Sequence, residues 1–180
     1  MDSFPAIEID KVKAWDFRLA NINTSECLNV AYGVDANYLD GVGVSITSIV
    51  INNRHVNLDF YIIADVYNDA FFQKVAKLAE QYQLRITLYR INTDKLQCLP
   101  CTQVWSRAMY FRLFAFQLLG LTLDRLLYLD ADVVCKGDIS QLLHLDLNGA
   151  VAAVVKDVDP MQEKAASRLS DPELLGQYFN

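Results

Sequence analysis

The sequence contains no apolar run of the ~18 residues that a membrane-spanning helix requires. Residues 1–16, MDSFPAIEIDKVKAWD, lack the continuous apolar core of a secretory signal peptide. Basic residues are in the minority, since 16 Lys and Arg stand against 22 Asp and Glu, for a net charge of −6. These absences argue against membrane insertion, secretion and non-specific binding to nucleic acid or anionic lipid. We therefore expect a cytoplasmic protein with no nucleic-acid partner.

Cysteine and histidine are also scarce, with four and two residues. Cysteines in a chain without a signal peptide remain thiols, so no disulfide framework is expected. Cys98 and Cys101 form a Cys-x-x-Cys motif, but no second pair completes a zinc site, and the motif does not open a helix as a redox site would. His55 and His144 are isolated, and we assign neither of them a catalytic role.

What the chain does have is enough apolar content for a core. Hydrophobic residues make up 53% of its 180 residues, and a chain of this length buries roughly 70% of its unfolded surface. No repeat or Pro/Gly/Ser-rich linker divides it. We set residues 1–25 apart as an N-terminal arm, because the first clear apolar strand begins at Cys27, and treat residues 26–180 as one domain. The final run, GQYFN, is typical of the opening of a further strand, so we expect a C-terminally incomplete domain.

Strand and helix patterns alternate along this domain. Apolar, β-branched runs predict strands, and helical spacing predicts two helices, the second with Ser106 as its N-cap and Gly120 just beyond its end. The segment Val42–Ile51 is rich in β-branched residues, so propensity alone favours a strand. We expect a helix there, because parallel neighbouring strands need a crossover connection. The predicted fold class is α/β, a mostly parallel open sheet with helices on both faces. The predicted strands are 27–34, 57–65, 84–91, 125–129 and 150–155, and the two helices are 69–82 and 106–119.

Acidic residues follow each predicted strand, at the edge where open α/β sheets bind ligands. In LLYLDADVV an apolar strand ends at Asp130, Ala131 and Asp132. Carboxylates two residues apart in an extended segment project to the same side, and two hard oxygen ligands suit Mg²⁺ or Mn²⁺. The alternative is that both aspartates only favour the turn that follows the strand.

A second polar cluster, YGVDANY, follows the first strand. Gly33 would let the backbone approach a ligand, Asp35 and Asn37 lie in the turn, and Tyr38 offers a flat ring. The alternative is a hydrogen-bonded Asx turn with no ligand. The cluster comprises Gly33, Val34, Asp35, Ala36, Asn37 and Tyr38.

One arginine lies in an otherwise apolar helix. Arg112 is surrounded in the sequence by Tyr110, Phe111, Leu113 and Phe114, so its guanidinium must reach a partner or the edge of the sheet. A simple salt bridge is the alternative to a role in ligand binding.

Together, the segments YGVDANY, SRAMYFRLFAFQLL and LLYLDADVVCKGDI resemble the retaining glycosyltransferases of family 8, which have the GT-A fold. The resemblance runs in order and spacing from about Glu26 to Asn180. Within the family, the sequence is most similar to the hexosyltransferases of the lipopolysaccharide core.

The resemblance implies a UDP-sugar donor, a lipopolysaccharide core acceptor and a divalent metal, Mg²⁺ or Mn²⁺. Asp130 and Asp132 would bind the metal, and Arg112 would reach the donor. The implied reaction moves glucose from UDP-glucose to a glucose hydroxyl of the outer core with retention of configuration. The α-1,3-glucosyl and α-1,3-galactosyl enzymes of the same pathway are the alternative. The implied UDP-sugar-binding residues are Gly33, Val34, Asp35, Ala36, Asn37, Tyr38, Arg112, Asp130, Ala131, Asp157 and Asn180.

The family's third metal ligand, a histidine, and its candidate catalytic glutamine would both lie beyond Asn180. We therefore expect the 180 residues alone to be inactive, and the full-length protein to be peripheral at the inner membrane on its cytoplasmic side, through the acceptor or a further C-terminal tail. Two alternatives come from other classes. A haloacid-dehalogenase-type phosphatase also has a strand ending in D-x-D, but usually near the start of its domain and followed by threonine, unlike Val133 and Val134 here. The other is a non-catalytic nucleotide-binding module.

Overall fold

The computed structural model describes residues 8–18, 26–101 and 106–169. The chain forms two compact units, residues 1–144 and residues 145–180, where the sequence had indicated one domain from residue 26 onward. Asn180 and the expected strand opening at 176–180 lie outside the described residues. None of the helices in the described ranges has the length and apolar character needed to span a bilayer.

The first unit contains a five-stranded sheet in the order β1-β4-β3-β2-β5. The three central strands and β5 run parallel, and β1 pairs antiparallel with β4 at one edge. The prediction of a mostly parallel open sheet is therefore confirmed. The strands are β1 (Ile9–Asp16), β2 (Cys27–Val34), β3 (Asn57–Ala64), β4 (Arg85–Ile91) and β5 (Leu127–Tyr128).

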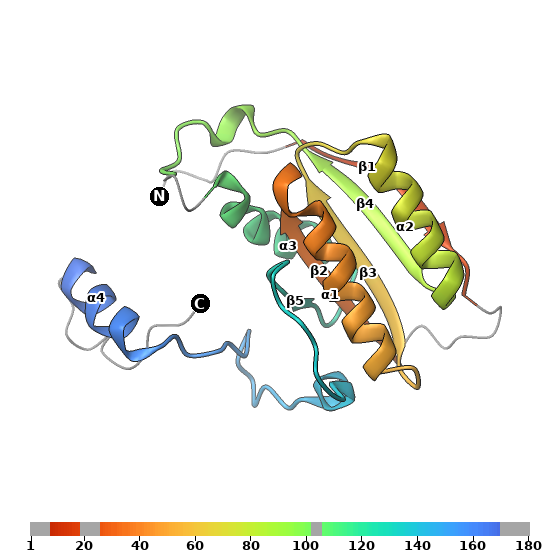
Figure 1. Ribbon diagram of the computed structural model, residues 1–180. Helices are drawn as coiled ribbons and strands as arrows, with labels where there is room; N and C mark the ends of the chain where they lie inside the picture. The colour runs from red at the N-terminus through yellow and green to blue at the C-terminus, as the bar shows by residue number, and fades with distance from the viewer. Residues whose placement is uncertain (1–7, 19–25, 102–105, 170–180) are drawn as a thin grey trace. The chain divides into compact units, whose positions relative to one another are not determined.

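Helices cover both faces of this sheet, as predicted (Figure 1). The helices α1 (Leu39–Asn52) and α2 (Asp69–Tyr82) pack on one face and α3 (Phe111–Leu119) on the other. Successive residues of a strand point to opposite faces, so Tyr32 joins the core under α1 while Ala31 joins the core under α3. Because both faces are buried, the central strands are mostly apolar, which is the pattern that made them predictable.

The ambiguous segment Val42–Ile51 is helical, within α1. Its β-branched residues pack into the core, since Val42 and Ile46 are fully buried. The requirement for a crossover between the parallel strands β2 and β3 therefore outweighs local β propensity.

Helix ends follow the expected chemistry. Asn68 caps α2 by accepting a hydrogen bond from the backbone N–H of Phe71 at 2.8 Å. Ser106 likewise accepts from the N–H of Ala108, which confirms it as an N-cap, although the first turn is a 3-10 helix that precedes α3. α3 ends at Gly120, whose φ of −64° lies in the right-handed helical region. A Cβ at this position would lie 2.6 Å from the Phe116 carbonyl oxygen, so the site has no room for a side chain.

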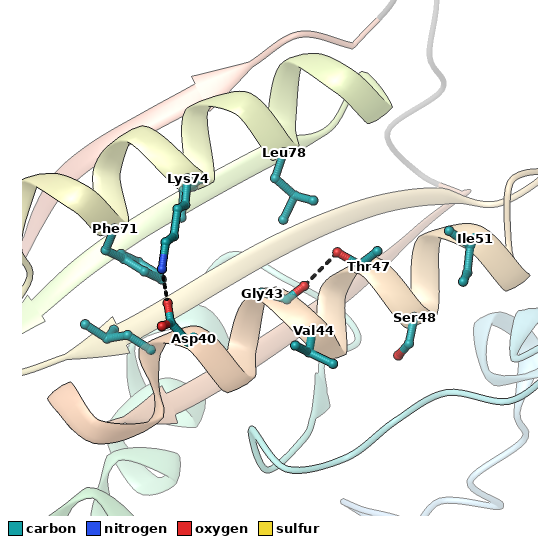
Figure 2. Close-up of a pocket in the computed structure, with 11 residues that line it drawn as sticks. Asp40, Gly43, Val44, Thr47, Ser48, Ile51, Phe71, Lys74 and Leu78 are labelled. Carbon is teal, nitrogen blue, oxygen red and sulfur yellow. Dashed lines mark hydrogen bonds and ion pairs between the residues drawn. The ribbon is translucent and has the colours of Figure 1, made fainter.

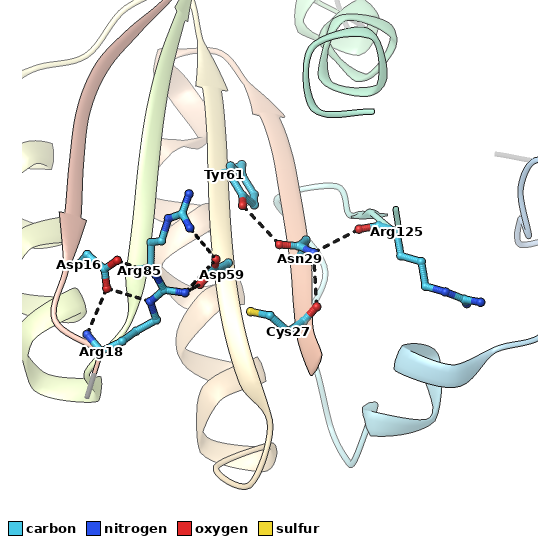
Figure 3. Close-up of polar contacts among 8 residues, drawn as sticks. All are labelled: Asp16, Arg18, Cys27, Asn29, Asp59, Tyr61, Arg85 and Arg125. Carbon is cyan, nitrogen blue, oxygen red and sulfur yellow. Dashed lines mark hydrogen bonds and ion pairs between the residues drawn. The ribbon is translucent and has the colours of Figure 1, made fainter. Parts of the chain in front are cut away.

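Part of the segment set apart as an N-terminal arm belongs to the sheet. Residues 9–16 form β1, and Arg18 joins this edge to the sheet interior by bonding both Asp16 and the buried Asp59 (Figure 3). Arg85 of β4 contacts the same Asp59 carboxylate at 3.2 Å. The strand was missed because most of its side chains are exposed, as the outer face of an edge strand permits.

The strand predicted at residues 150–155 is absent from the described chain. These residues are exposed and unpaired in the second unit, and Val151 and Val155 are 102% and 80% exposed. Strand propensity depends on packing against neighbours, so an apolar run without a partner does not form one. The second unit instead contains one helix, α4 (Asp159–Leu169).

Candidate functional site

The candidate site lies where the parallel strands β2, β3 and β5 end. Their common direction brings Asp35, Asp65 and Asp130 to the same edge of the sheet, which is where open α/β sheets bind ligands. Arg112 reaches this edge from α3 on the opposite face to α1.

The turn after β2 is an Asx turn. Asp35 accepts a hydrogen bond from the backbone N–H of Asn37 at 2.9 Å and begins the short 3-10 helix Ala36–Tyr38. The Asx turn expected as one possibility for this cluster is therefore present, and it leaves other groups of the cluster accessible. Val34 is buried, whereas the Tyr38 side chain is 54% exposed and offers its ring to solvent.

Gly33 is required by close packing inside the chain. A Cβ at this position would lie 2.7 Å from Phe111 Cβ and 2.7 Å from the Tyr128 hydroxyl. The space on the Cβ side of Gly33 is thus occupied by α3 and β5. Gly33 therefore brings the helix that carries Arg112 and the strand that leads to Asp130 close together.

The D-x-D segment forms a tight turn. β5 pairs with β2 over Leu127–Tyr128 only, and the Leu129 N–H donates to the Ala31 carbonyl at 3.0 Å. The Val133 N–H then bonds the Asp130 carbonyl at 3.2 Å, so the segment bends instead of continuing extended as predicted. Asp130 is half-buried and Asp132 is exposed.

Ala131, between the two aspartates, is buried against α1. A Cβ at Gly41 would lie 3.0 Å from the Ala131 carbonyl oxygen, so the helix backbone packs directly on this turn. The turn thus presents its carboxylates from a fixed backbone.

Arg112 and Asp130 form an ion pair, with Nη2 2.9 Å from Oδ1. The guanidinium carbon also lies 5.3 Å from the ring centroid of Tyr128. Burial raises the pKa of Tyr128 to about 12, against the opposing effect of the Arg112 charge, so this phenol remains protonated at neutral pH. Arg112 Nε is buried and has no hydrogen-bond partner among the described residues.

Asp65 is a site residue that the sequence marks only by its position after a strand. Its Oδ1 is buried without a hydrogen-bond partner in the described part of the chain. Burial raises the pKa of this carboxyl, and the charge of Asp35 raises it further, while the backbone N–H groups of Asp65 and Val66 oppose the rise. A carboxyl in this state is suited to accept a donor group from a ligand.

The donor set fits a hard divalent cation that keeps several ligand positions for water and phosphate. Asp130 and Asp132 supply carboxylate oxygens two residues apart on one turn. The described ranges contain no group of three His, Cys, Asp or Glu side chains that could hold a metal ion, so any further ligands would come from elsewhere.

Other predicted residues are not brought to this edge by the first unit. Asp157 belongs to the second unit, where it accepts a hydrogen bond from the Val158 N–H at 2.7 Å. Its carbonyl accepts from Gln162 Nε2 at 2.9 Å, next to the start of α4. Cys98 and Cys101 are exposed thiols, and His55 lies 3.5 Å from Asp138.

A separate groove of about 570 Å³ runs between α1 and α2 (Figure 2). Its lining is mostly apolar, and Lys74 bonds Asp40 across it at 2.7 Å. Within the described part of the chain, none of the residues expected to bind the UDP-sugar lines this groove.

Known proteins are similar to this chain in sequence and in fold. The chain is 96% identical over its whole length to the lipopolysaccharide 1,2-glucosyltransferase of Escherichia coli (strain K12), of which it covers 53%. It is 36% identical, over 92% of its length, to half of the lipopolysaccharide 1,3-galactosyltransferase of Salmonella typhimurium. The chain thus spans about half the length of these curated relatives.

A solved structure of the galactosyltransferase LgtC, in complex with donor and acceptor sugar analogs, matches with a TM-score of 0.70 and 19% identity. The match covers 79% of this chain and 51% of that one. It confirms the GT-A-like fold. Residues 29–180 also match the model of the family described as glycosyl transferase family 8. The chain therefore belongs to glycosyl transferase family 8.

Proposed function

We propose that this chain is the nucleotide-sugar-binding part of a retaining enzyme that moves glucose from UDP-glucose to a glucose hydroxyl of the lipopolysaccharide outer core. The near-identity to a lipopolysaccharide 1,2-glucosyltransferase supports the substrate class. The observation that carries the proposal is the D-x-D turn at the carboxyl edge of the sheet, with Arg112 bonded to Asp130. Transfer to a different hydroxyl, or transfer of galactose, is the second candidate, supported by the similarity to a 1,3-galactosyltransferase.

Asp130 and Asp132 would hold a Mg²⁺ or Mn²⁺ ion with the UDP diphosphate. When bound, a divalent ion stabilises negative charge on the departing diphosphate, an effect worth several kcal/mol in the transition state. The ion pair with Arg112 holds Asp130 in one direction, and the guanidinium offers positive charge at the same edge. Strong, oriented electrostatics of this kind need little reorganisation during the reaction.

The turn after β2 would hold the nucleoside. The exposed Tyr38 ring can stack on uracil, and the backbone from Asp35 to Asn37 can contact the ribose. Asp157 and Asn180 remain proposed ligands of the donor sugar. The acceptor would be the lipopolysaccharide core, which would bring the protein to the cytoplasmic face of the inner membrane.

The test is a thermal melt of the chain with Mn²⁺ and UDP, separately and together. A ligand at about 100 times its Kd stabilises a protein by about 2.7 kcal/mol, or roughly 5 to 10 °C for a domain of this size. We expect this rise only when both are present, and its loss in Asp132→Ala.

The matched control is Asp124→Ala, which removes an exposed aspartate that precedes β5. This variant should keep the full rise. A rise with UDP that is independent of metal, a rise that survives Asp132→Ala, or no rise in the unaltered chain would each contradict the proposal.

A further inference from the structure

The segment that follows the D-x-D turn, residues 133–139, is held by side chains of α1 and of Asn53, the residue that caps the end of α1. The Cys135 N–H donates to Ser48 Oγ at 2.9 Å, and Asn52 Nδ2 donates to the Cys135 carbonyl at 3.1 Å. Asn53 continues the contact by accepting from the Ile139 N–H at 2.7 Å and donating to the Gly137 carbonyl at 3.2 Å. These four hydrogen bonds, made by three side chains, hold the segment in place of the pairing that a neighbouring strand would provide.

Two of these side chains are deeply buried. Asn53 is 0% exposed and Ser48 is 7% exposed. The Ser48 hydroxyl donates to the Ser45 carbonyl at 2.7 Å, which leaves its lone pairs to accept from Cys135. Asn53 also donates to the Ile49 carbonyl at 2.9 Å, so its amide orientation is fixed by the helix. Leaving a buried donor or acceptor unpaired destabilises the folded chain, so the backbone of residues 135–139 is tied to these positions.

The other half of α1 contacts the turn itself. Gly41 packs on the Ala131 carbonyl, and Ala131 is buried between the two aspartates. Because β5 pairs over only two residues, strand pairing alone gives the turn little support. The helix therefore contacts the segment both at the aspartates and just beyond them.

We propose that Ser48, Asn52 and Asn53 are positioning residues for the metal-binding turn. By fixing residues 135–139 against α1, they set the direction in which Asp130 and Asp132 present their carboxylates. This inference rests on the proposed function of the D-x-D turn, and it assigns the buried polar side of α1 a role in metal and UDP binding. Groups that orient metal ligands typically change metal affinity by 10–100-fold when removed.

The chain offers a matched pair of substitutions on adjacent residues. Ser48→Ala removes the acceptor for the Cys135 N–H, whereas Thr47→Ala removes a hydroxyl that bonds only the Gly43 carbonyl of its own helix. Figure 2 shows Thr47 on the side of α1 that faces α2, and Ser48 directed to the other side. Asn52→Ala is a milder second variant, because Asn52 is exposed and loses its bond to the Cys135 carbonyl without opening the core.

Two measurements test the proposal on the whole chain. Amide hydrogen exchange should become faster in residues 131–139 of Ser48→Ala and Asn52→Ala, and remain unchanged there in Thr47→Ala. The affinity for Mn²⁺ in the presence of UDP, measured from the electron paramagnetic resonance signal of free Mn²⁺, should fall roughly tenfold or more in Ser48→Ala. Thr47→Ala should bind as the unaltered chain does.

Unchanged exchange in residues 131–139 would overturn the inference, and so would faster exchange with unchanged Mn²⁺ affinity. Both results leave the proposed function intact, provided that the unaltered chain binds Mn²⁺ with UDP. Absence of that binding in the unaltered chain would instead overturn the proposed function, and the inference with it.

Discussion

Arg112 Nη2 lies 2.9 Å from Asp130 Oδ1, which joins α3 to the first carboxylate of the D-x-D turn. The two side chains are 30% and 44% exposed, and a pair this accessible adds only about 0–1 kcal/mol to stability. Its importance is therefore geometric, since it fixes Asp130 and places a guanidinium at the edge where a diphosphate would bind.

Replacing Arg112 with lysine should weaken UDP binding far more than it weakens the fold. Lysine keeps the charge but loses the planar fork that reaches Asp130 and packs over Tyr128. A hydrogen bond to a charged group is worth about 1.5–3 kcal/mol, so we expect roughly a tenfold or greater loss of UDP affinity by calorimetry with Mn²⁺ present.

Arg107→Lys is the control, because Arg107 bonds the Leu96 and Gln97 carbonyls and not the site. That variant should bind UDP normally. Equal affinity in Arg112→Lys and the unaltered chain would show that the guanidinium fork plays no part in binding.

Gly33→Ala should destabilise the chain, whereas Gly43→Ala should not. A Cβ at Gly33 would meet Phe111 Cβ and the Tyr128 hydroxyl at 2.7 Å, and overpacking of this kind costs about 1–3 kcal/mol. Gly43 lies inside α1 with nothing near its would-be Cβ, so alanine there should stabilise by up to about 1 kcal/mol. Urea unfolding measures both, and similar midpoints for the two variants would argue against the tight packing at Gly33.

The central sheet and its helices were predictable because burial on both faces leaves continuous apolar runs such as Cys27–Val34. The D-x-D pair was predictable for the same reason, since it directly follows such a run. The prediction was wrong in opposite ways for two segments. Residues 9–16 form a strand despite their polar side chains, and residues 150–155 form no strand in the described part of the chain despite their apolar ones. In both segments the presence of a pairing partner decides the outcome, and partners are not encoded locally.

The contacts around the site were harder to foresee. Nothing near Gly33 in the sequence indicates that Phe111 and Tyr128 pack against it, because both are distant in sequence. Ser48 and Asn53 carry no motif, because their role depends on a loop more than 80 residues away that only the fold brings to α1. The positions of strand ends are therefore predictable from the sequence, while the contacts around them depend on packing between distant segments.

Replacing Arg18 with methionine should destabilise the chain by about 3 kcal/mol. Arg18 bonds Asp59 at 3.0 Å, and these side chains are only 13% and 4% exposed. Removing one partner of a buried pair typically costs about 3–5 kcal/mol because the remaining charge stays buried, although Arg85 still contacts Asp59 here. Burial already raises the pKa of Asp59 against the pull of both arginines, so the loss of Arg18 should raise it further.

The control replaces another cation with the same side chain. Lys74 pairs with Asp40 at 2.7 Å, but the two side chains are 63% and 77% exposed, so Lys74→Met should change stability by less than about 1 kcal/mol. Equal unfolding midpoints for Arg18→Met and Lys74→Met would mean that the contact between Arg18 and Asp59 does not stabilise the chain.

Asp65→Asn should raise the melting temperature at pH 7, and the gain should disappear in acid. Burial raises the pKa of Asp65 in the folded chain above its ordinary value of 3.8. The folded state therefore binds the proton more tightly than the unfolded state, and stability falls as pH rises through the folded pKa. Below pH 3.8 the carboxyl is protonated in both states, and this loss is absent.

The amide that Asp65→Asn introduces carries no charge at any of these pH values. The stability of the variant therefore does not fall for this reason as pH rises, and in acid the variant has no advantage over the unaltered chain. Melts from about pH 3 to pH 7 should show two curves that separate as pH rises. Asp69→Asn, at an exposed position in the first turn of α2, is the control and should not reproduce this separation. A melting temperature that falls at pH 7 in Asp65→Asn would show that the carboxylate makes a stabilising contact, and that Asp65 is held charged at the end of β3 by a partner.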